Sequence, residues 1–270
     1  MNCIFCKEPS DNSKSVEHIL PESLGNEDHV LKPGVVCDKC NNYFATKIEK
    51  VVLDKPYFKN VRHRNFIRTK KGRLVPDKVL FPHKDAGWTD FWIDEKGFIL
   101  NSEDSNIAKM IKNGQLNKMI MPIIGDPEPN DKEVSRFLAK VGLEFLAYKF
   151  QNEQPWIDEL VNKVELDPIR NYARYGEGTY WEYHQRRIYT EEDRFVDPVN
   201  HPEPYEILHE FDFLYTESQI MYFVMVIMGI EYAINLGGSE VKIYENWLTE
   251  HNNISPIRRF SEYMIDRKKI

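Results

Sequence analysis

The longest regular pattern of apolar positions runs from Asp131 to Phe150. Its apolar residues recur every three or four positions, the period of a helix with one buried face; they are Val134, Phe137, Leu138, Val141, Phe145 and Leu146. Asn130 and Glu133 have the spacing of a capping box, in which two side chains satisfy backbone amides at a helix start. The pattern therefore predicts a helix over 131–150 with Asn130 as its cap.

Shorter apolar runs in the second half of the chain predict β-strands. Phe211–Tyr215 is one run, and Met221–Leu236 is a longer one that is interrupted near Gly229 and ended by a Gly-Gly pair. The part from 220 to 230 is membrane-like in composition, but it is only about half as long as a spanning helix and runs into Glu231. We interpret it as buried core.

Two other segments have the pattern of β-hairpins. Asp90–Leu100 has apolar residues on both sides of a polar turn that ends in Gly97. Asn65–Thr69 and Leu74–Val75 read as strands around a basic turn. The basic residues in this second segment are Arg62, Arg64, Arg68, Lys70, Lys71 and Arg73. They could follow a phosphate backbone without reading its sequence, or they could simply be solvated.

Rings and guanidinium groups alternate over Arg170–Gly176 and Tyr180–Arg187. Because arginine pairs with phosphates and aromatic rings stack on bases, these segments are candidates for a surface that reads a nucleic-acid target. Aromatic-rich segments more often build a core, and that is the interpretation we favour here.

The charge of the chain is uneven. The whole chain has a formal net charge of -7, which argues against attraction of its entire surface to nucleic acid. Residues 1–75 nevertheless carry 14 Lys+Arg and 9 Asp+Glu, a net charge of +5, so the remainder carries 22 and 34, a net charge of -12. We expect the acidic remainder to sense a protein partner, a modified base or a small ligand, or to form a homodimer.

All four cysteines lie in two CxxC pairs, Cys3 with Cys6 and Cys37 with Cys40. Two such pairs can offer four thiolates to one tetrahedral structural zinc ion. Disulfides or a redox-active pair are the alternatives. The N-terminus has no secretory pattern, so we expect a cytoplasmic protein, in which disulfides are disfavoured. A closed zinc site leaves no position for substrate, so any chemistry must come from residues between the pairs.

The residues between the pairs carry a recognisable order. Glu17-His18 is followed by a proline three positions after the histidine and then by Gly25-Asn26, and the second CxxC is followed at once by Asn41-Asn42. This arrangement resembles the HNH endonuclease family over about residues 1–55, a fifth of the chain. The resemblance implies a ββα-metal fold, in which two strands and a helix hold a divalent cation against the scissile phosphate.

The resemblance also implies roles for these residues. His18 would be the general base, since an imidazole ordinarily titrates near neutral pH. Glu17 and Asn41 would supply oxygen ligands to catalytic Mg²⁺ or Mn²⁺, which would stabilise the leaving oxygen. Asn41 or Asn42 stands where the family name has its last histidine, and either could touch the metal. Asn26 is the candidate for orienting His18.

Two details of this site stay open at the level of sequence. Glu17 and His18 are adjacent, and adjacent residues of a strand point to opposite faces, so they converge only if the strand ends or bends there. His29 is a further candidate, although a lone loop histidine is usually solvated. The helix expected over Cys40–Val52 would bury Phe44 and Ile48, with either Val51 or Val52 on the same face.

The sequence therefore predicts an α+β protein made of three parts. These are a zinc-bound HNH domain over 1–58, a basic and aromatic hairpin region over 59–121, and a larger mixed α/β domain over 122–270. The expected function is hydrolysis of DNA, double-stranded in the first instance, with 5′-phosphate products, in restriction or phage defence. The alternative is a zinc ribbon that binds nucleic acid or protein without cutting, with Asn41 as a helix cap.

Overall fold

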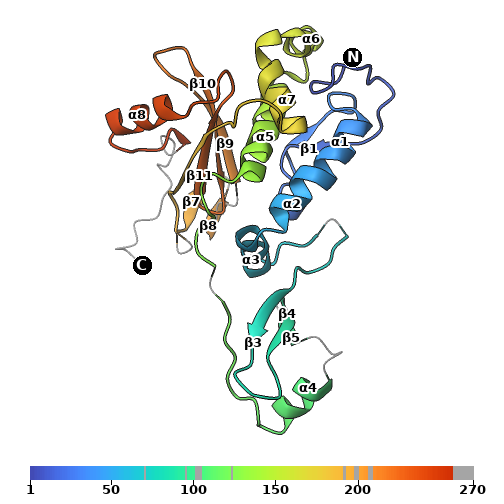
Figure 1. Ribbon diagram of the computed structural model, residues 1–270, viewed down its shortest axis with the longest axis vertical. Helices are drawn as coiled ribbons and strands as arrows, with labels where there is room; N and C mark the ends of the chain where they lie inside the picture. Colours follow the sequence, from blue (N-terminus) through green and yellow to red (C-terminus); the bar gives the residue numbers. More distant parts are fainter. Residues whose placement is uncertain are drawn as a thin grey trace. The chain divides into compact units, whose positions relative to one another are not determined.

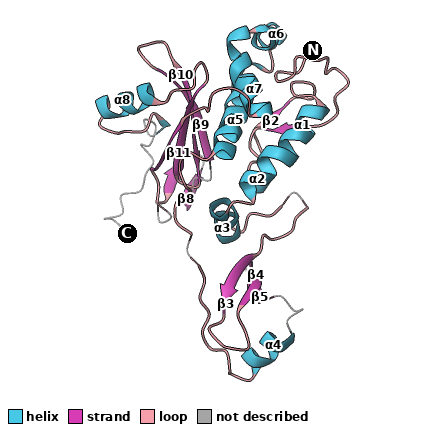
Figure 2. Ribbon diagram, in the orientation of Figure 1, coloured by secondary structure: helices cyan, strands magenta, loops and turns pink. Residues whose placement is uncertain are grey.

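Figure 1 shows the chain as a computed structural model of residues 1–270. The structure describes residues 1–69, 71–94, 96–100, 105–122, 124–190, 193–197, 201–205 and 209–257. Helices and strands are mixed along this range, which confirms the predicted α+β class (Figure 2).

The chain folds into two compact units. The first consists of Met1–Pro21, Asn26–Val52 and Glu128–Ile270, and the second of Glu22–Gly25 and Leu53–Pro127. The expected segments 1–58 and 122–270 thus share most of one unit instead of forming separate domains. One reason is helix α5 (Lys132–Phe150). It contacts β2 (Val30–Leu31) and the helical segment η2 (Ala45–Glu49) of segment 1–58, and β11 (Ile230–Asn235) of segment 122–270.

The N-terminal part of the first unit has the order strand, strand, helix. β1 (Glu17–His18) pairs antiparallel with β2 (Val30–Leu31), with Glu17 opposite Leu31 and His18 opposite Val30. Between them lies the short 3₁₀ helix η1 (Glu22–Leu24). One cysteine pair precedes this hairpin in the sequence and the other follows it. A cluster of the two pairs therefore brings the two ends of the hairpin segment together.

The helix expected over Cys40–Val52 forms, but it begins earlier and is not uniform. It consists of α1 (Asp38–Phe44), the π-helical segment η2 (Ala45–Glu49) and α2 (Lys50–Leu53). Phe44, Ile48 and Val52 are fully buried, whereas Val51 is 40% exposed, so Val52 completes the buried face. A π-helical turn has more residues than an α-helical one, which keeps three positions spaced by four on the same side.

Three helices connect this part to the C-terminal sheet. They are α5, α6 (Gln154–Asn162) and α7 (Asp167–Tyr175), with the 3₁₀ turn η3 (Val164–Leu166) before α7. The prediction of α5 is confirmed, but its cap is different. The Asp131 carboxylate, not Asn130, accepts the amides of Glu133 and Val134. The buried surface of α5 also extends well beyond the predicted stripe.

The C-terminal sheet has four antiparallel strands in the order β6-β11-β10-β9. They are β6 (Tyr183–Arg187), β9 (His209–Tyr215), β10 (Met221–Ile227) and β11 (Ile230–Asn235). As predicted, the long apolar run is split at Gly229, whose φ is +83°. A Cβ at this position would collide with the Tyr189 carbonyl oxygen, so the tight turn requires glycine.

Both faces of the sheet are covered. On one face the Phe223 ring packs 5.7 Å from that of Phe145 on α5, and on the other the Tyr222 ring lies 5.4 Å from that of Tyr244 on α8 (Lys242–Glu250). Alternate residues of β10 therefore serve two cores, which explains the continuous apolar run. β7 (Phe195–Asp197) and β8 (His201–Tyr205) form a separate antiparallel pair.

The second unit is smaller and has its own core. It contains α3 (Pro56–Arg64), the antiparallel strands β3 (Asp77–Leu80), β4 (Trp88–Asp94) and β5 (Gly97–Leu100), and α4 (Ser105–Lys112). Its buried cluster consists of Val79, Phe81, Phe91, Ile107, Met110 and Leu116. The predicted hairpin over 90–100 is confirmed as β4 and β5.

The strands predicted on both sides of the basic turn are not formed. Residues 65–69 and 74–75 have no strand structure, although Thr69 and Arg73 share a backbone hydrogen bond of 2.8 Å across the turn. Gly72 adopts a φ of +70°. Within the described residues, no helix is long and apolar enough to cross a membrane.

Candidate metal centre and nuclease site

The four cysteine sulfurs converge within the first unit. Their Sγ atoms all lie within 4.8 Å of one another, and those of Cys6 and Cys37 are 3.6 Å apart. This distance is too long for a disulfide bond of about 2.05 Å. It is close to the roughly 3.8 Å expected between two thiolates on a tetrahedral zinc with Zn–S bonds of about 2.3 Å. All four are free cysteines, so the donor set fits a structural zinc ion.

Backbone amides support the sulfurs. The Cys37 amide donates to Cys3 Sγ at 3.3 Å, and the Cys40 amide donates to Cys37 Sγ at 3.4 Å. A hydrogen bond with Cys40 lowers the pKa of Cys3 to about 5, whereas burial raises the pKa of Cys6 to about 11. Four thiolates this close repel one another, so they can all ionise only around a cation.

Helix α7 holds the first cysteine pair from outside. Arg170, which is 2% exposed, donates through Nε to the Ile4 carbonyl oxygen inside the pair at 2.7 Å. Lys7, directly after the pair, forms an ion pair with Asp167 at 2.5 Å. Burial by itself would lower the pKa of Arg174, but the charges of the nearby cysteines and of Tyr175 have the larger effect and raise it. α7 therefore supplies the positive charge that a zinc tetrathiolate needs nearby.

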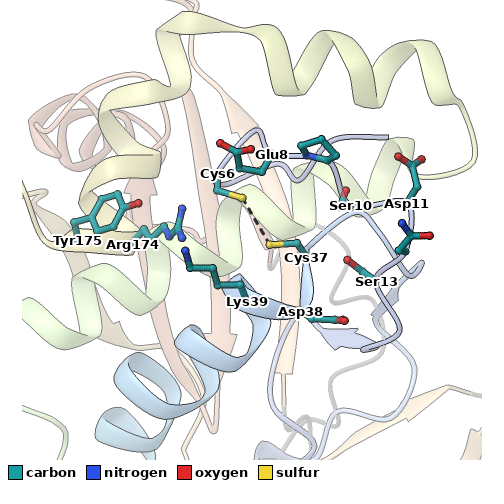
Figure 3. Close-up of a pocket in the computed structure, with 12 residues that line it drawn as sticks. Cys6, Glu8, Ser10, Asp11, Ser13, Cys37, Asp38, Lys39, Arg174 and Tyr175 are labelled. Atoms are coloured by element: carbon teal, nitrogen blue, oxygen red, sulfur yellow. Dashed lines mark hydrogen bonds between the residues drawn. The ribbon is translucent and has the colours of Figure 1, made fainter.

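A groove of about 540 Å³ opens beside this centre. Figure 3 shows Lys39, Arg174 and Tyr175 on the side of the groove next to Cys6 and Cys37. The Arg174 guanidinium lies 5.0 Å from the centre of the Tyr175 ring, which is 51% exposed. Other members of the two arginine and aromatic segments belong to the core, as favoured from the sequence: Arg170, Tyr172, Trp181 and Tyr183 are buried. Arg186 and Arg187 are half-buried.

The second cysteine pair positions Asn41. The side chain that caps α1 is Cys37, so the capping role that the zinc-ribbon alternative gives to Asn41 is wrong. Asn41 lies in the first turn and donates through Nδ2 to the Val16 carbonyl oxygen at 3.1 Å, which joins α1 to the start of β1. Because this bond uses the amide nitrogen, Oδ1 is the atom left to bind a cation. Asn42 is exposed, one position further along.

Glu17 and His18 do not converge in this structure. The Glu17 side chain turns inward, is 6% exposed, and places Oε1 2.6 Å from Nζ of Lys140 on α5. His18 is half-buried, and Val16, two residues before it, is 45% exposed. The alternation of a β-strand is therefore kept through β1. The expected Glu17 ligand is bound to an ammonium group and not directed to the face of His18.

Asn26 closes the loop that follows β1. It is fully buried, donates through Nδ2 to the carbonyl oxygens of Leu20 and His29 at 2.8 and 3.1 Å, and accepts the His29 amide through Oδ1 at 3.0 Å. The His29 carbonyl in turn accepts the Ile19 amide at 3.1 Å. Asn26 does not need to contact His18 to influence it, because it holds the backbone directly after it.

His29 is not a solvated loop residue. Its ring packs against Tyr148, His209 and Phe211 at centroid distances of 5.5, 5.9 and 5.1 Å, and burial lowers its pKa. These contacts tie the end of the loop to α5 and β9. His29 is therefore part of the packing between the hairpin and the sheet.

The predicted basic contacts divide into buried and exposed groups. Arg62 lies in α3, is 6% exposed, and has its pKa lowered by burial, so it offers little surface to a nucleic acid. Arg64 is half-buried at the end of the same helix. Lys70 lies outside the described residues. The exposed cations of the turn are Arg68, Lys71 and Arg73.

The segment that contains the four cysteines, β1 and β2 is similar to a known protein family. Residues 3–55 match the family model described as HNH endonuclease. This segment is an HNH domain. It has the ββα order and the four-cysteine cluster together, and the family match supports a nuclease of the HNH type. No curated protein and no solved structure matches the chain.

Lys140, Glu49 and Glu144 were missed in the sequence. With Glu17 of β1 they form a cluster in which Lys140 contacts all three glutamates. They lie in helices, where the apolar pattern of the sequence does not single out polar residues as buried. A signal was present: Lys140 and Glu144 are an opposite-charge pair at i and i+4 inside a segment with apolar residues on nearly every side. Such a pair has to be buried when the helix is central.

Proposed function

We propose that this protein is a metal-dependent endonuclease that hydrolyses DNA, with His18 as the general base. The main support for this proposal is a hydrogen bond that connects α1 to the start of β1 within the HNH domain. Asn41 bonds the carbonyl of Val16, two residues before His18 on the same face of the strand. This contact brings the histidine strand and the proposed cation ligand together.

The reaction needs little from the chain beyond these groups. A water molecule attacks phosphorus, His18 takes its proton, and the bond from phosphorus to the leaving oxygen breaks. Mg²⁺ or Mn²⁺, when bound, would stabilise the negative charge on that oxygen. Asn41 Oδ1 would hold it together with phosphate oxygens and water, a ligand set that Mg²⁺ commonly has. Asn26 keeps the backbone after His18 in place.

We propose that the exposed turn cations Arg68, Lys71 and Arg73 add sequence-independent contacts to DNA phosphates. The affinity they provide would fall as salt rises, because it depends on release of counterions. A natural setting is cleavage of invading DNA in restriction or phage defence, with the acidic part of the chain choosing a partner or a target.

The test is cleavage of supercoiled plasmid with Mg²⁺ or Mn²⁺. We expect His18→Ala to lower the rate by at least about 100-fold, the usual contribution of a general base. The matched control is His83→Ala in the second unit, which should cut like the wild type. Equal nicking by wild type and His18→Ala would exclude His18 as the base.

One observation favours the alternative of a zinc module that binds without cutting. Glu17, the expected carboxylate ligand of the catalytic cation, is engaged with Lys140. A binding module would retain DNA or a protein partner in a zinc-dependent way and show no cleavage with any divalent cation. The two functions are separated by the same plasmid assay run beside a gel-shift measurement.

A further inference from the structure

Lys140 is a lysine with no exposed surface at the centre of three glutamates. Its Nζ lies 2.6 Å from Glu17 Oε1, 2.6 Å from Glu49 Oε1 and 2.9 Å from Glu144 Oε2. The lysine and Glu144 side chains are fully buried, and those of Glu17 and Glu49 are 6% and 13% exposed. We refer to these four residues as the Lys140 cluster.

The cluster joins three elements of the first unit. Glu17 comes from β1, Glu49 from the end of η2, and Lys140 and Glu144 from successive turns of α5. Nζ also lies within 3.4 Å of the carbonyl oxygens of His18 and Ile19. The ammonium group therefore holds the backbone of the proposed catalytic residue itself, in addition to the side chain before it.

The charges of the cluster explain why it is rigid. Burial alone lowers the pKa of Lys140, but the three carboxylates outweigh it and raise that pKa, so the lysine stays charged. Burial raises the pKa of Glu144 and of Glu17. Moving Lys140 out of the cluster would leave its buried charge without any of its carboxylate partners, which is strongly unfavourable. The cluster thus resists displacement of β1.

Strand pairing alone would hold β1 weakly. β1 and β2 have two residues each, and Pro21 follows only three residues after the end of β1. A pair this short is not stable without packing from another element. α5 supplies that packing through Lys140, which contacts the Glu17 side chain and the His18 carbonyl oxygen.

We infer that Lys140 is a positioning residue for the HNH reaction: it holds β1 so that the His18 side chain is correctly placed to act as the base. Glu17 then acts through its contact with Lys140 and is not a ligand of the catalytic cation. This inference rests on the proposed function. It assigns a part of the catalytic apparatus to α5, outside the residues that match the family.

The first measurement is cleavage kinetics of Lys140→Met, which has a side chain of similar length without charge. We expect kcat to fall about 100-fold, the effect of misplacing a catalytic group by about 1 Å, while KM for DNA stays near the wild-type value. A thermal melt establishes that the variant is folded. An unchanged kcat in folded Lys140→Met would overturn the inference.

The second measurement compares Glu17→Gln with Glu49→Gln. The two glutamates make the same 2.6 Å contact with Lys140, but only Glu17 precedes His18, so Glu49 is a matched control. We expect the Mn²⁺ concentration that gives half-maximal rate to be the same in both variants and the wild type. A rise of about tenfold in Glu17→Gln alone would make Glu17 a metal ligand and reject our assignment. This comparison decides the question even if Lys140→Met does not fold.

The third measurement does not need activity. In histidine-labelled full-length protein, the ring resonances of His18 should move in both Lys140→Met and Glu17→Ala, while those of His83 stay fixed. Unmoved His18 resonances would refute positioning by Lys140. If no variant, including the wild type, cuts DNA, the proposed nuclease fails, and these spectra still show whether Lys140 holds the strand.

Discussion

At the scale of single residues, the notable feature is a set of charges that the fold buries instead of exposing. Lys140, Glu144 and Arg170 are each 0 to 2% exposed, and each has partners on other elements or in its own helix. Replacing such groups one at a time leaves a partner unsatisfied, which costs more than the pair contributes. These residues therefore define how the elements must fit.

The Lys140 cluster predicts an unusual dependence of stability on pH. A carboxyl group whose pKa is raised in the folded state binds its proton more tightly there than in the unfolded chain. The stability it contributes is present below the ordinary value of 4.5 and is lost as pH rises through the raised value. Because Glu144→Gln cannot ionise, we expect its free energy of unfolding to fall less with rising pH above about 4.5 than that of the wild type.

Urea denaturation of the zinc-loaded protein at several pH values measures this difference. Contributions of the cysteines are common to both proteins and cancel in the comparison. Glu159→Gln, at an exposed position of α6, is the control and should follow the wild type. Parallel curves for wild type and Glu144→Gln would show that Glu144 is not protonated preferentially in the folded state.

At the scale of elements, the HNH hairpin and helix are short and depend on what they are fastened to. The cysteines fix their ends, Asn26 fixes the loop between the strands, and α5 and α7 fix them from the body of the first unit. The proposed function thus assigns stability and chemistry to different side chains of one small segment. They should be separable by substitution.

We expect Cys37→Ser to lose bound zinc and to melt at a much lower temperature, because a structural zinc site supplies folding free energy. His18→Ala should instead keep its zinc and lose much less stability, because His18 is only half-buried and is not one of the four cysteine ligands. Metal analysis and thermal melts of both variants provide the comparison. Similar destabilisation of the two would mean that His18 is a structural residue.

At the scale of the whole molecule, most of the HNH domain, residues 1–21 and 26–52, belongs to one compact unit with Glu128–Ile270. Buried cations from that region contact it: Lys140 at β1, and Arg170 at the first cysteine pair. The acidic C-terminal region thus has a structural role in addition to any role in recognition. The second unit, by contrast, has its own core.

A fragment of residues 1–58 should therefore not fold stably, even when loaded with zinc. Glu17 and Glu49 would lose their ammonium partner, and the Ile4 carbonyl oxygen would lose Arg170. We expect poorly dispersed amide resonances in the fragment and well-dispersed resonances for the same residues in the full chain. A zinc-loaded fragment with a dispersed spectrum and a cooperative melt would show that residues 1–58 form an independent domain.

The sequence by itself determined the features that depend on local pattern. The two CxxC pairs, the acid-histidine strand, the helix after the second pair, α5 and the split strand pair at Gly229 could all be predicted, because spacing and periodicity record them directly. The tertiary structure decided what each side chain faces. Strand alternation alone left open whether Glu17 would meet a cation or the core, and only the packing of α5 brought Lys140 to it. The same packing merged two expected domains into one unit, since long-range contacts between buried charges leave no periodic trace in the sequence.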